Sequence, residues 1–418
     1  MKQGACLALL CALTIGPVRG QTLEISEAYR EAEANFPRLQ EVMLQERALE
    51  LHLGSLAADW LPAIQAGGQA VYHSTVASLP LTVPGMVIPE VPHSQFRFGL
   101  TVEQRVWDGG LSGAQARLAG VVAELSIQDA RVAAYGLRTL VEDAYFGALE
   151  AGVHLAALST FAEELESRLR QVEVARSQGA ATASGEAVLK AELLRLEQQR
   201  IQAQGAERGA RAVLSALMGR EVHPGIALLA PNGLGPDGQR PEELIFSLNR
   251  DRLEREADLV SRRNRPRIQA FGDVAAGRPP GLDLFEDSVE PFFSAGLRIQ
   301  WPVFDGRKAV RDLERIRVES EVVDAREAAF RQSLQVADAR LESRIAAIEE
   351  ALVRDDEIIA LRTVVAREAA TRMENGAATA TDYLTERNAE HRARLDAELR
   401  RISLWKARAQ RHTLRGAQ

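Results

Sequence analysis

The chain has 418 residues, of which 46% are hydrophobic, 26% charged and 5% aromatic, and its net charge is −7. A chain of this length usually forms two or three domains. The ordinary apolar fraction disfavours wholesale disorder, a collagen-like fibre and a polytopic helical membrane protein. The acidic balance disfavours a nucleic-acid-binding protein. Much of the apolar content is Ala and Leu, which is typical of long helices.

Residues 1–20 have the features of a secretory signal peptide. A positively charged start precedes a mostly apolar run, and small residues allow cleavage before Gln21. The alternative, a short buried helix, would be unusual at a chain terminus. Both cysteines, Cys6 and Cys11, lie in this segment, so we expect a mature chain without a thiol for disulfides, catalysis or metal binding. No later stretch reaches the about 18 apolar residues of a membrane-spanning helix.

After an opening helix, two strands are expected within about residues 61–107. From Phe96 to Val106, apolar side chains occupy one face and Arg, Gly, Thr and Glu the other. A half-buried soluble sheet alternates in this way, and so does a membrane barrel strand, which needs about 9–11 such residues. The pattern alone leaves both interpretations open. Four strands per chain cannot close a barrel, so the membrane interpretation requires several copies.

Three of the four tryptophans stand at the helix-proximal ends of the predicted strands. They are Trp60, Trp107 and Trp301. Tryptophans at one level are typical of the girdle at a membrane–water interface, which favours the membrane interpretation.

A very long helix is predicted over about residues 110–178. From Ala116 to Val172, small or apolar residues recur at spacings that alternate between four and three, which is the 3.5-residue period of a left-handed coiled coil. Such a helix would be about 100 Å long. Gly179 breaks it, and Thr182 is placed to cap a returning helix. Together they predict a helical hairpin over about 110–218.

The second half of the chain repeats the first. Gly-Ala-Ala-Thr-Ala at 179–183 recurs at 376–380, and the Asp-Gly turn at 108–109 recurs at 305–306, both shifted by 197 residues. We therefore predict one structural repeat over 21–220, a linker over 221–240 and a second repeat over 241–418. The second repeat should hold a helix, two strands within about 265–304 and a helical hairpin over about 307–415.

The seam of the second long helix carries charge where the first is apolar, which predicts either a partly solvated face or a displaced seam. The adjacent acids at 355–356 are interpreted as a solvated patch. The charged seam residues are Asp338, Asp355 and Arg362, in place of Val141, Leu158 and Leu165.

In this plan the chain resembles the TolC-like outer-membrane efflux proteins over essentially its mature length. The resemblance rests on the duplication, on Leu61-Pro62 before the first strand, on the two Asp-Gly turns and on the Gly-Ala-Ala-Thr tips. It implies a mainly α-helical fold with a membrane β-barrel part. Three chains would form a 12-stranded barrel that continues into an α-helical coiled-coil tunnel in the periplasm, with residues 221–240 as an equatorial linker.

The resemblance also implies location, partners and function. A homotrimer in the outer-membrane lipid bilayer, with a large periplasmic part, would be the passive exit duct of a tripartite efflux or type I secretion system. Its tips would meet a periplasmic adaptor (membrane fusion) protein and an inner-membrane pump or ABC transporter. The adaptor-contacting tip residues would be Gly179, Ala180, Ala181, Thr182, Gly376, Ala377, Ala378 and Thr379.

Acidic residues ring the periplasmic constriction in the family. The position six residues after the second tip glycine is Asp382, the next family position is Thr385, and Glu386 is adjacent. The resemblance therefore implies Asp382, Thr385 and Glu386 as pore-constriction residues. By itself, a carboxylate near a helix start is more often a cap or a solvated group.

No catalytic, cofactor or metal site is predicted. The seven histidines are scattered without a ligand spacing, and the turn glycines follow neither the Walker nor the dinucleotide pattern. No nucleic-acid partner is expected. The competing hypothesis is an exported periplasmic coiled-coil structural or adaptor protein with a soluble β-domain, and an enzyme ranks third.

Overall fold

The computed structural model describes residues 22–77, 91–179, 182–231, 238–283 and 286–416. The predicted signal peptide and the tip residues Ala180 and Ala181 lie outside these ranges. The chain divides into two compact units. The helical unit comprises Met1–Leu39, Arg131–Pro241 and Phe330–Gln418, and the sheet unit comprises Gln40–Ala130 and Glu242–Ala329. Each unit draws residues from both halves of the chain, so the sequence repeat is not the unit of packing.

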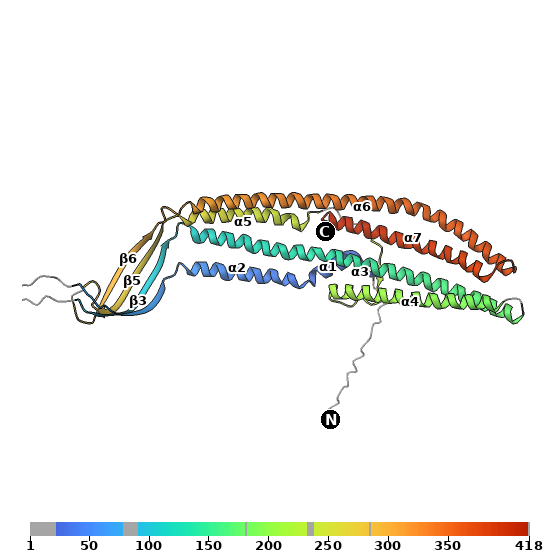
Figure 1. Cartoon of the computed structure of the whole chain (residues 1–418), viewed down its shortest axis with the longest axis horizontal. Helices are drawn as coiled ribbons and strands as arrows, with labels where there is room; N and C mark the ends of the chain where they lie inside the picture. Colours follow the sequence, from blue (N-terminus) through green and yellow to red (C-terminus); the bar gives the residue numbers. More distant parts are fainter. Residues whose placement is uncertain (1–21, 78–90, 180–181, 232–237, 284–285, 417–418) are drawn as a thin grey trace, which may run out of the picture. The chain divides into compact units, whose positions relative to one another are not determined.

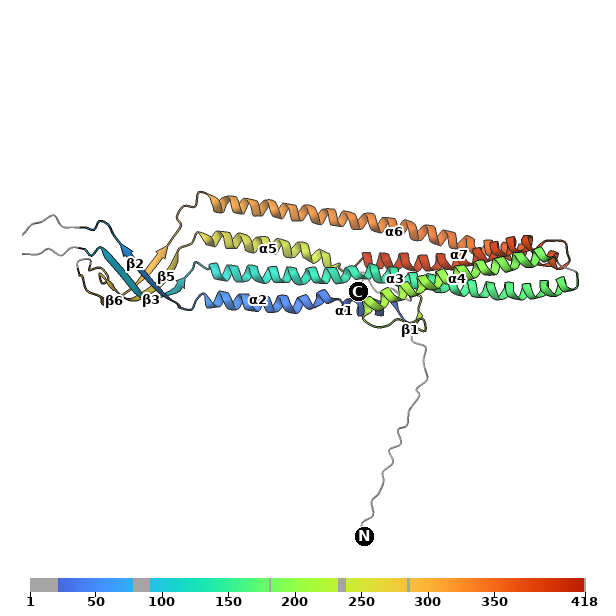
Figure 2. The same ribbon diagram turned by 60° about the horizontal axis from the view of Figure 1, so that its bottom comes forward.

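The sheet unit contains one antiparallel sheet with the order β2-β3-β5-β6 (Figures 1 and 2). Each half of the chain supplies one hairpin, and the pairing of β3 with β5 joins the halves. The elements of the unit are α2 (Gln40–Ala58), β2 (Ala63–Tyr72), β3 (Ser94–Trp107), α5 (Pro241–Arg263), β5 (Arg267–Arg278), β6 (Glu290–Gln300) and the first parts of α3 (Leu111–Ser177) and α6 (Lys308–Glu374).

Helices α5 and α6 lie side by side in the sheet unit (Figure 1). Their small core contains Leu253 and Val260 of α5 and Ile316 and Val323 of α6. Both pairs are seven residues apart, as expected when two helices share a coiled-coil seam.

The helical unit holds the remaining parts of α3 and α6 together with their returning helices. In both views α4 runs alongside α3, and α7 runs alongside α6 (Figures 1 and 2). An apolar cluster that includes Leu158, Leu165, Leu189 and Tyr383 unites α3, α4 and α7. The other elements of the unit are β1 (Thr22–Leu23), α1 (Ile25–Ala34), η1 (Pro37–Leu39), α4 (Ala183–Met218), β4 (Ala227–Leu228) and α7 (Ala380–Leu414).

The duplicated plan of two strands, a long helix and a returning helix is confirmed. The two long helices α3 and α6 have the same length, 67 residues each. Each is followed by a glycine with a positive φ, Gly179 at 75° and Gly376 at 71°, a conformation that glycine adopts without steric cost. The turns of both halves therefore begin with a glycine in the same left-handed conformation.

The two hairpins differ in the chemistry of their seams. Val141 and Leu214 belong to one apolar cluster between α3 and α4. The equivalent positions in the second hairpin hold an ion pair, Asp338 to Arg411 at 2.8 Å. Hydrogen bonds from Arg411 and Arg415 hold the pKa of Asp338 well below its usual range.

At two further seam positions the second hairpin also has an ion pair where the first has apolar side chains. Leu165 and Leu189 share a cluster in the first hairpin, whereas Arg362 pairs with Glu386 at 3.4 Å in the second. Asp355 pairs with Arg400 and is only 7% exposed, so its interpretation as part of a solvated patch is wrong. The charged seam is therefore not displaced, because each charge meets an opposite charge on α7, and it is partly solvated, since the side chain of Arg362 is 48% exposed.

A carboxyl group, Glu142 of α3, is buried in the core of the helical unit. Its Oε1 accepts hydrogen bonds from the hydroxyl of Tyr29 at 2.9 Å and from the hydroxyl of Thr413 at 2.5 Å. Burial raises the pKa of Glu142, and the two hydroxyl donors oppose this shift only in part.

We expect Glu142→Gln to stabilise the protein near neutral pH and to have little effect in acid. A raised folded-state pKa means that the folded protein binds the proton more tightly than the unfolded chain does. The stability linked to this proton is fully present below the ordinary pKa of 4.5 and is lost as pH rises through the folded-state pKa. Denaturant unfolding at a series of pH values measures the effect. A stability difference that does not change with pH would contradict it.

Candidate functional site

One face of the four-stranded sheet is apolar and exposed. The strand register brings alternate residues of β2, β3, β5 and β6 to this face, because directly opposed residues project to the same side. Its large side chains are 37% to 81% exposed, far more than a soluble core allows. A contiguous exposed patch of this kind marks an interaction surface. Its members include Ile64, Phe98, Leu100, Val274, Phe293 and Leu297.

The opposite face of the sheet is polar and internally bonded. Asp273 of β5 accepts a hydrogen bond from the Thr101 hydroxyl of β3 at 2.6 Å and lies 3.4 Å from a guanidinium nitrogen of Arg97. On the same face, Arg298 of β6 pairs with Glu103 of β3 at 3.2 Å. The sheet thus separates an apolar side from a hydrogen-bonded, charged side.

A β-bulge sets the position of one predicted girdle residue. The register shifts between Arg105 and Trp107, so Trp107 pairs with Ile268, which in turn pairs with Ile299 on the apolar face. Uninterrupted alternation would have placed Trp107 on the polar face beside Arg105. No sequence signal marked this bulge, which re-aims one side chain.

The three predicted girdle tryptophans all lie in the sheet unit at strand ends. Trp60 follows α2, Trp107 ends β3 and Trp301 follows β6. They are 38%, 42% and 60% exposed, respectively. Their role at a membrane interface stays a prediction.

Two equivalent aspartates begin the long helices. Asp108 accepts hydrogen bonds from the backbone N–H groups of Gly110 at 2.8 Å and Ser112 at 2.7 Å. Burial opposes its ionisation, but the hydrogen bonds from Ser112 and Gly110 prevail and lower the pKa of Asp108. The amide of Asn264 and the first backbone N–H groups of α6 likewise lower the pKa of Asp305. Both carboxylates therefore stay charged as helix caps.

At the tips, the predicted caps are present. Thr182 accepts a hydrogen bond from the N–H of Gly185 at 3.2 Å and begins α4. Thr379 begins α7 and forms a capping box with Asp382. The tip residues Gly179, Gly376, Ala377 and Ala378 lie in the turns before these caps. Their contact with an adaptor stays a prediction.

The three predicted constriction residues share one face of α7, because Thr385 and Glu386 follow Asp382 by three and four residues. Asp382 and Thr385 are exposed and Glu386 is half-buried. The Thr379 backbone N–H and hydroxyl lower the pKa of Asp382. Asp382 is thus a cap, one of the two interpretations that the sequence left open, and it is also an ionised, exposed group. Whether the three residues line a pore stays a prediction.

A charged network that the sequence did not reveal links the two hairpins near the tips. Glu164 of α3 accepts a hydrogen bond from Arg387 Nε of α7 at 2.6 Å and one from the Tyr383 hydroxyl at 3.1 Å. Arg387 also pairs with Glu390, which is 2% exposed and receives further hydrogen bonds from Arg394 and Thr363. We call Glu164, Tyr383, Arg387 and Glu390 the cross-hairpin network. The spacing of Tyr383, Arg387 and Glu390 on one helix face was the only signal available.

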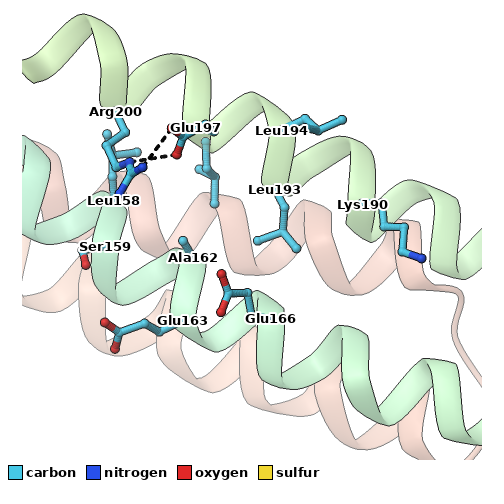
Figure 3. A pocket seen from close by; sticks show the side chains of 11 residues that line it. Leu158, Ser159, Ala162, Glu163, Glu166, Lys190, Leu193, Leu194, Glu197 and Arg200 are labelled. Carbon is cyan, nitrogen blue, oxygen red and sulfur yellow. Dashed lines mark hydrogen bonds and ion pairs between the residues drawn. The ribbon is translucent and has the colours of Figure 1, made fainter.

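A groove of about 630 Å³ lies between α3 and α4 on the first hairpin. In Figure 3, Leu193 points from α4 toward Ala162 and Glu166 of α3, whereas Leu194 points away. Leu193 and Ala162 belong to the apolar floor of the groove, and charged side chains border it. They include Glu163, Glu166, Lys190, Glu197 and Arg200.

Within the described residues, no group of histidine, cysteine and acidic side chains could hold a metal ion. No helix in these same ranges is long and apolar enough to cross a bilayer.

Comparisons with known proteins bear on the fold. No protein-family model matches the chain, and no curated protein matches it in sequence. Solved structures match over 94% of its length. CusC, from a study of transmembrane channel formation, is 13% identical with a TM-score of 0.70 and 92% of its own chain covered. The Campylobacter jejuni outer membrane channel CmeC is 15% identical, with a TM-score of 0.66 and 86% covered.

The Vibrio cholerae outer membrane protein VceC is 16% identical, with a TM-score of 0.66 and 96% of its chain covered. The chain therefore has the fold of outer-membrane channel proteins. The predicted resemblance to TolC-like proteins is confirmed at the level of the fold, and so is the predicted mainly α-helical class. The predicted membrane barrel part corresponds to the four-stranded sheet of the described chain.

Proposed function

We propose that the protein is an outer-membrane channel, the passive exit duct of a tripartite efflux or type I secretion system. The observation that carries this proposal is the sheet, which exposes an apolar face on one side and a bonded polar network on the other. An apolar face toward lipid and a polar face toward water are what a membrane-spanning sheet requires. The shared fold with outer-membrane channels supports the same conclusion.

Oligomerisation follows from the edges of the sheet. Strands β2 and β6 each pair on one side only within the described sheet. An edge in lipid would leave backbone N–H and C=O groups without partners, at a cost of several kcal/mol for each group. We infer that β6 of one copy pairs with β2 of the next, and that three copies close a 12-stranded barrel. Residues 1–20 as an export signal, and the repeats 21–220 and 241–418 joined by the linker 221–240, are part of this proposal.

The periplasmic partners are proposed on the tips and on the groove of the first hairpin. The groove pairs an apolar floor with charged borders, which suits an amphipathic helix. A periplasmic adaptor that presents a helical hairpin fits this surface. An inner-membrane pump or ABC transporter would then deliver the substrate through the adaptor.

The direct test is to purify the mature protein from outer membranes in detergent, then to measure its mass and its conductance in planar bilayers. We expect a trimer with stable single-channel conductance. A water-soluble monomer without conductance would overturn the proposal and favour a periplasmic structural or adaptor protein.

At the constriction, we expect Asp382→Asn to lower cation preference more than Glu386→Gln does. The Asp382 carboxylate is exposed and ionised, whereas Glu386 lies 3.4 Å from the guanidinium of Arg362, which offsets its charge. Reversal potentials across a KCl gradient measure the preference. If Asp382→Asn leaves the reversal potential unchanged, Asp382 does not line the pore.

A further inference from the structure

The segment between β6 and the first turn of α6 combines exposed apolar and exposed basic side chains. The apolar members are 60% to 82% exposed, and the basic members follow them after the Asp305-Gly306 turn. We call this segment, residues 301–311, the basic–aromatic junction. Its apolar side chains ahead of α6 are Trp301, Val303 and Phe304, and its cations are Arg307, Lys308 and Arg311.

Arg307 adopts a left-handed backbone conformation, with φ at 62°. The equivalent residue of the first half is Gly110, with φ at 83°. This conformation is disfavoured for every residue with a Cβ, so glycine is the unstrained choice. At Gly110 an added Cβ would lie 2.3 Å from Nη1 of Arg262, so the end of that long side chain would have to shift. At position 307 the chain keeps an arginine despite the strain, which points to a use for its guanidinium.

The neighbouring acids do not neutralise these cations. Asp305 is engaged by the amide of Asn264 at 2.7 Å and by the N–H of Ala309 at 2.9 Å, and Asp312 faces Arg263 at 3.9 Å. Within the described part of the chain, the side chains of Arg307, Lys308 and Arg311 form no ion pair. Three exposed positive charges therefore remain beside an exposed tryptophan.

We propose that the basic–aromatic junction binds the anionic headgroups of phospholipids in the leaflet next to the helices. The proposal rests on the proposed function, which places the apolar face of the sheet in a bilayer. At a membrane surface, tryptophan occupies the headgroup level, and lysine and arginine attract anionic lipids. Trp301, Val303 and Phe304 would enter the boundary of the acyl chains, while Arg307, Lys308 and Arg311 meet the phosphates.

The test compares lipid binding by the full-length assembly and by the variant Arg307→Gly/Lys308→Gln/Arg311→Gln. Arg307→Gly introduces the residue found at the equivalent position 110. Glycine adopts the left-handed conformation without strain, so we expect the backbone to keep its conformation. The matched control removes three exposed cations of the helical unit, as Arg170→Gln/Arg372→Gln/Arg392→Gln. Native mass spectrometry after incubation with equal phosphatidylglycerol and phosphatidylcholine gives the ratio of the two lipids retained.

We expect the wild type and the control to retain phosphatidylglycerol preferentially. Each cation near an anionic surface contributes about fivefold, so the junction variant should lose more than tenfold of this preference. Excess inorganic phosphate should not abolish it. Displacement by phosphate alone would show a site for free anions, and dissociation of the variant into monomers would show a subunit interface. Either result would overturn the lipid proposal.

Conductance in bilayers of phosphatidylcholine separates this proposal from the channel function. If both proteins conduct and the junction variant keeps its lipid preference, the lipid proposal is wrong and the channel function stands. If the wild type neither inserts nor conducts, both fail.

Discussion

Leu100→Lys is expected to prevent assembly in the outer membrane. Leu100 lies at the centre of β3 on the apolar face, between Ala66 of β2 and Val274 of β5, and it is 50% exposed. A lysine on the lipid face of a barrel costs about 2–4 kcal/mol near the mid-plane of the bilayer. Three copies carry this cost in a trimer. Heat-modifiable oligomer bands in outer-membrane fractions measure the assembled protein.

Gln65→Lys is the matched control, since Gln65 pairs with Thr101 on the polar face. A lysine there would lie near Asp273, which Thr101 contacts, and we expect normal assembly. If the two lysines are equally harmful or equally harmless, the two faces of the sheet do not meet different solvents.

The second large effect is expected from Arg387→Ala in the cross-hairpin network. The change leaves Glu164 without its guanidinium partner and leaves Glu390, which is 2% exposed, with Arg394 and Thr363 only. Breaking a buried ion pair from one side costs about 3–5 kcal/mol. We expect about 2 kcal/mol per chain here, because Glu390 keeps two of its partners. Thermal unfolding measures this loss.

In the proposed channel, the same variant should also raise conductance, because Arg387 joins α7 to α3 near the tips. Arg392→Ala removes an exposed arginine of the same helix and serves as the control. A conductance equal to that of the control would show that the network stabilises the fold without restraining the tips.

The architecture could be predicted because its signals are local and repeated. The 3.5-residue period predicted α3, the recurrence of Gly-Ala-Ala-Thr predicted both turns, and the alternation from Phe96 to Val106 predicted one apolar face. Each of these signals lies within a stretch of chain that forms one element. Because the second half repeats the first, the same elements could then be predicted in the second half.

The parts of the site that could not be predicted depend on contacts between distant segments. Glu164 and Arg387 are 223 residues apart in sequence, and nothing near either residue shows that they meet. The bulge before Trp107 exists only as a mismatch between two strands. Asp355 looked solvated because its partner, Arg400, lies on another helix.

The ionic seam of the second hairpin constrains how the two halves of the chain can evolve. Replacing Asp338 by valine, its counterpart in the first half, would take the shared carboxylate from Arg411 and Arg415. Placing an aspartate at position 141 would bury a lone carboxylate in an apolar cluster. Both single steps lead through a less stable protein, because paired residues are strongly coupled. Converting one seam into the other without loss of stability therefore requires coordinated changes on two helices.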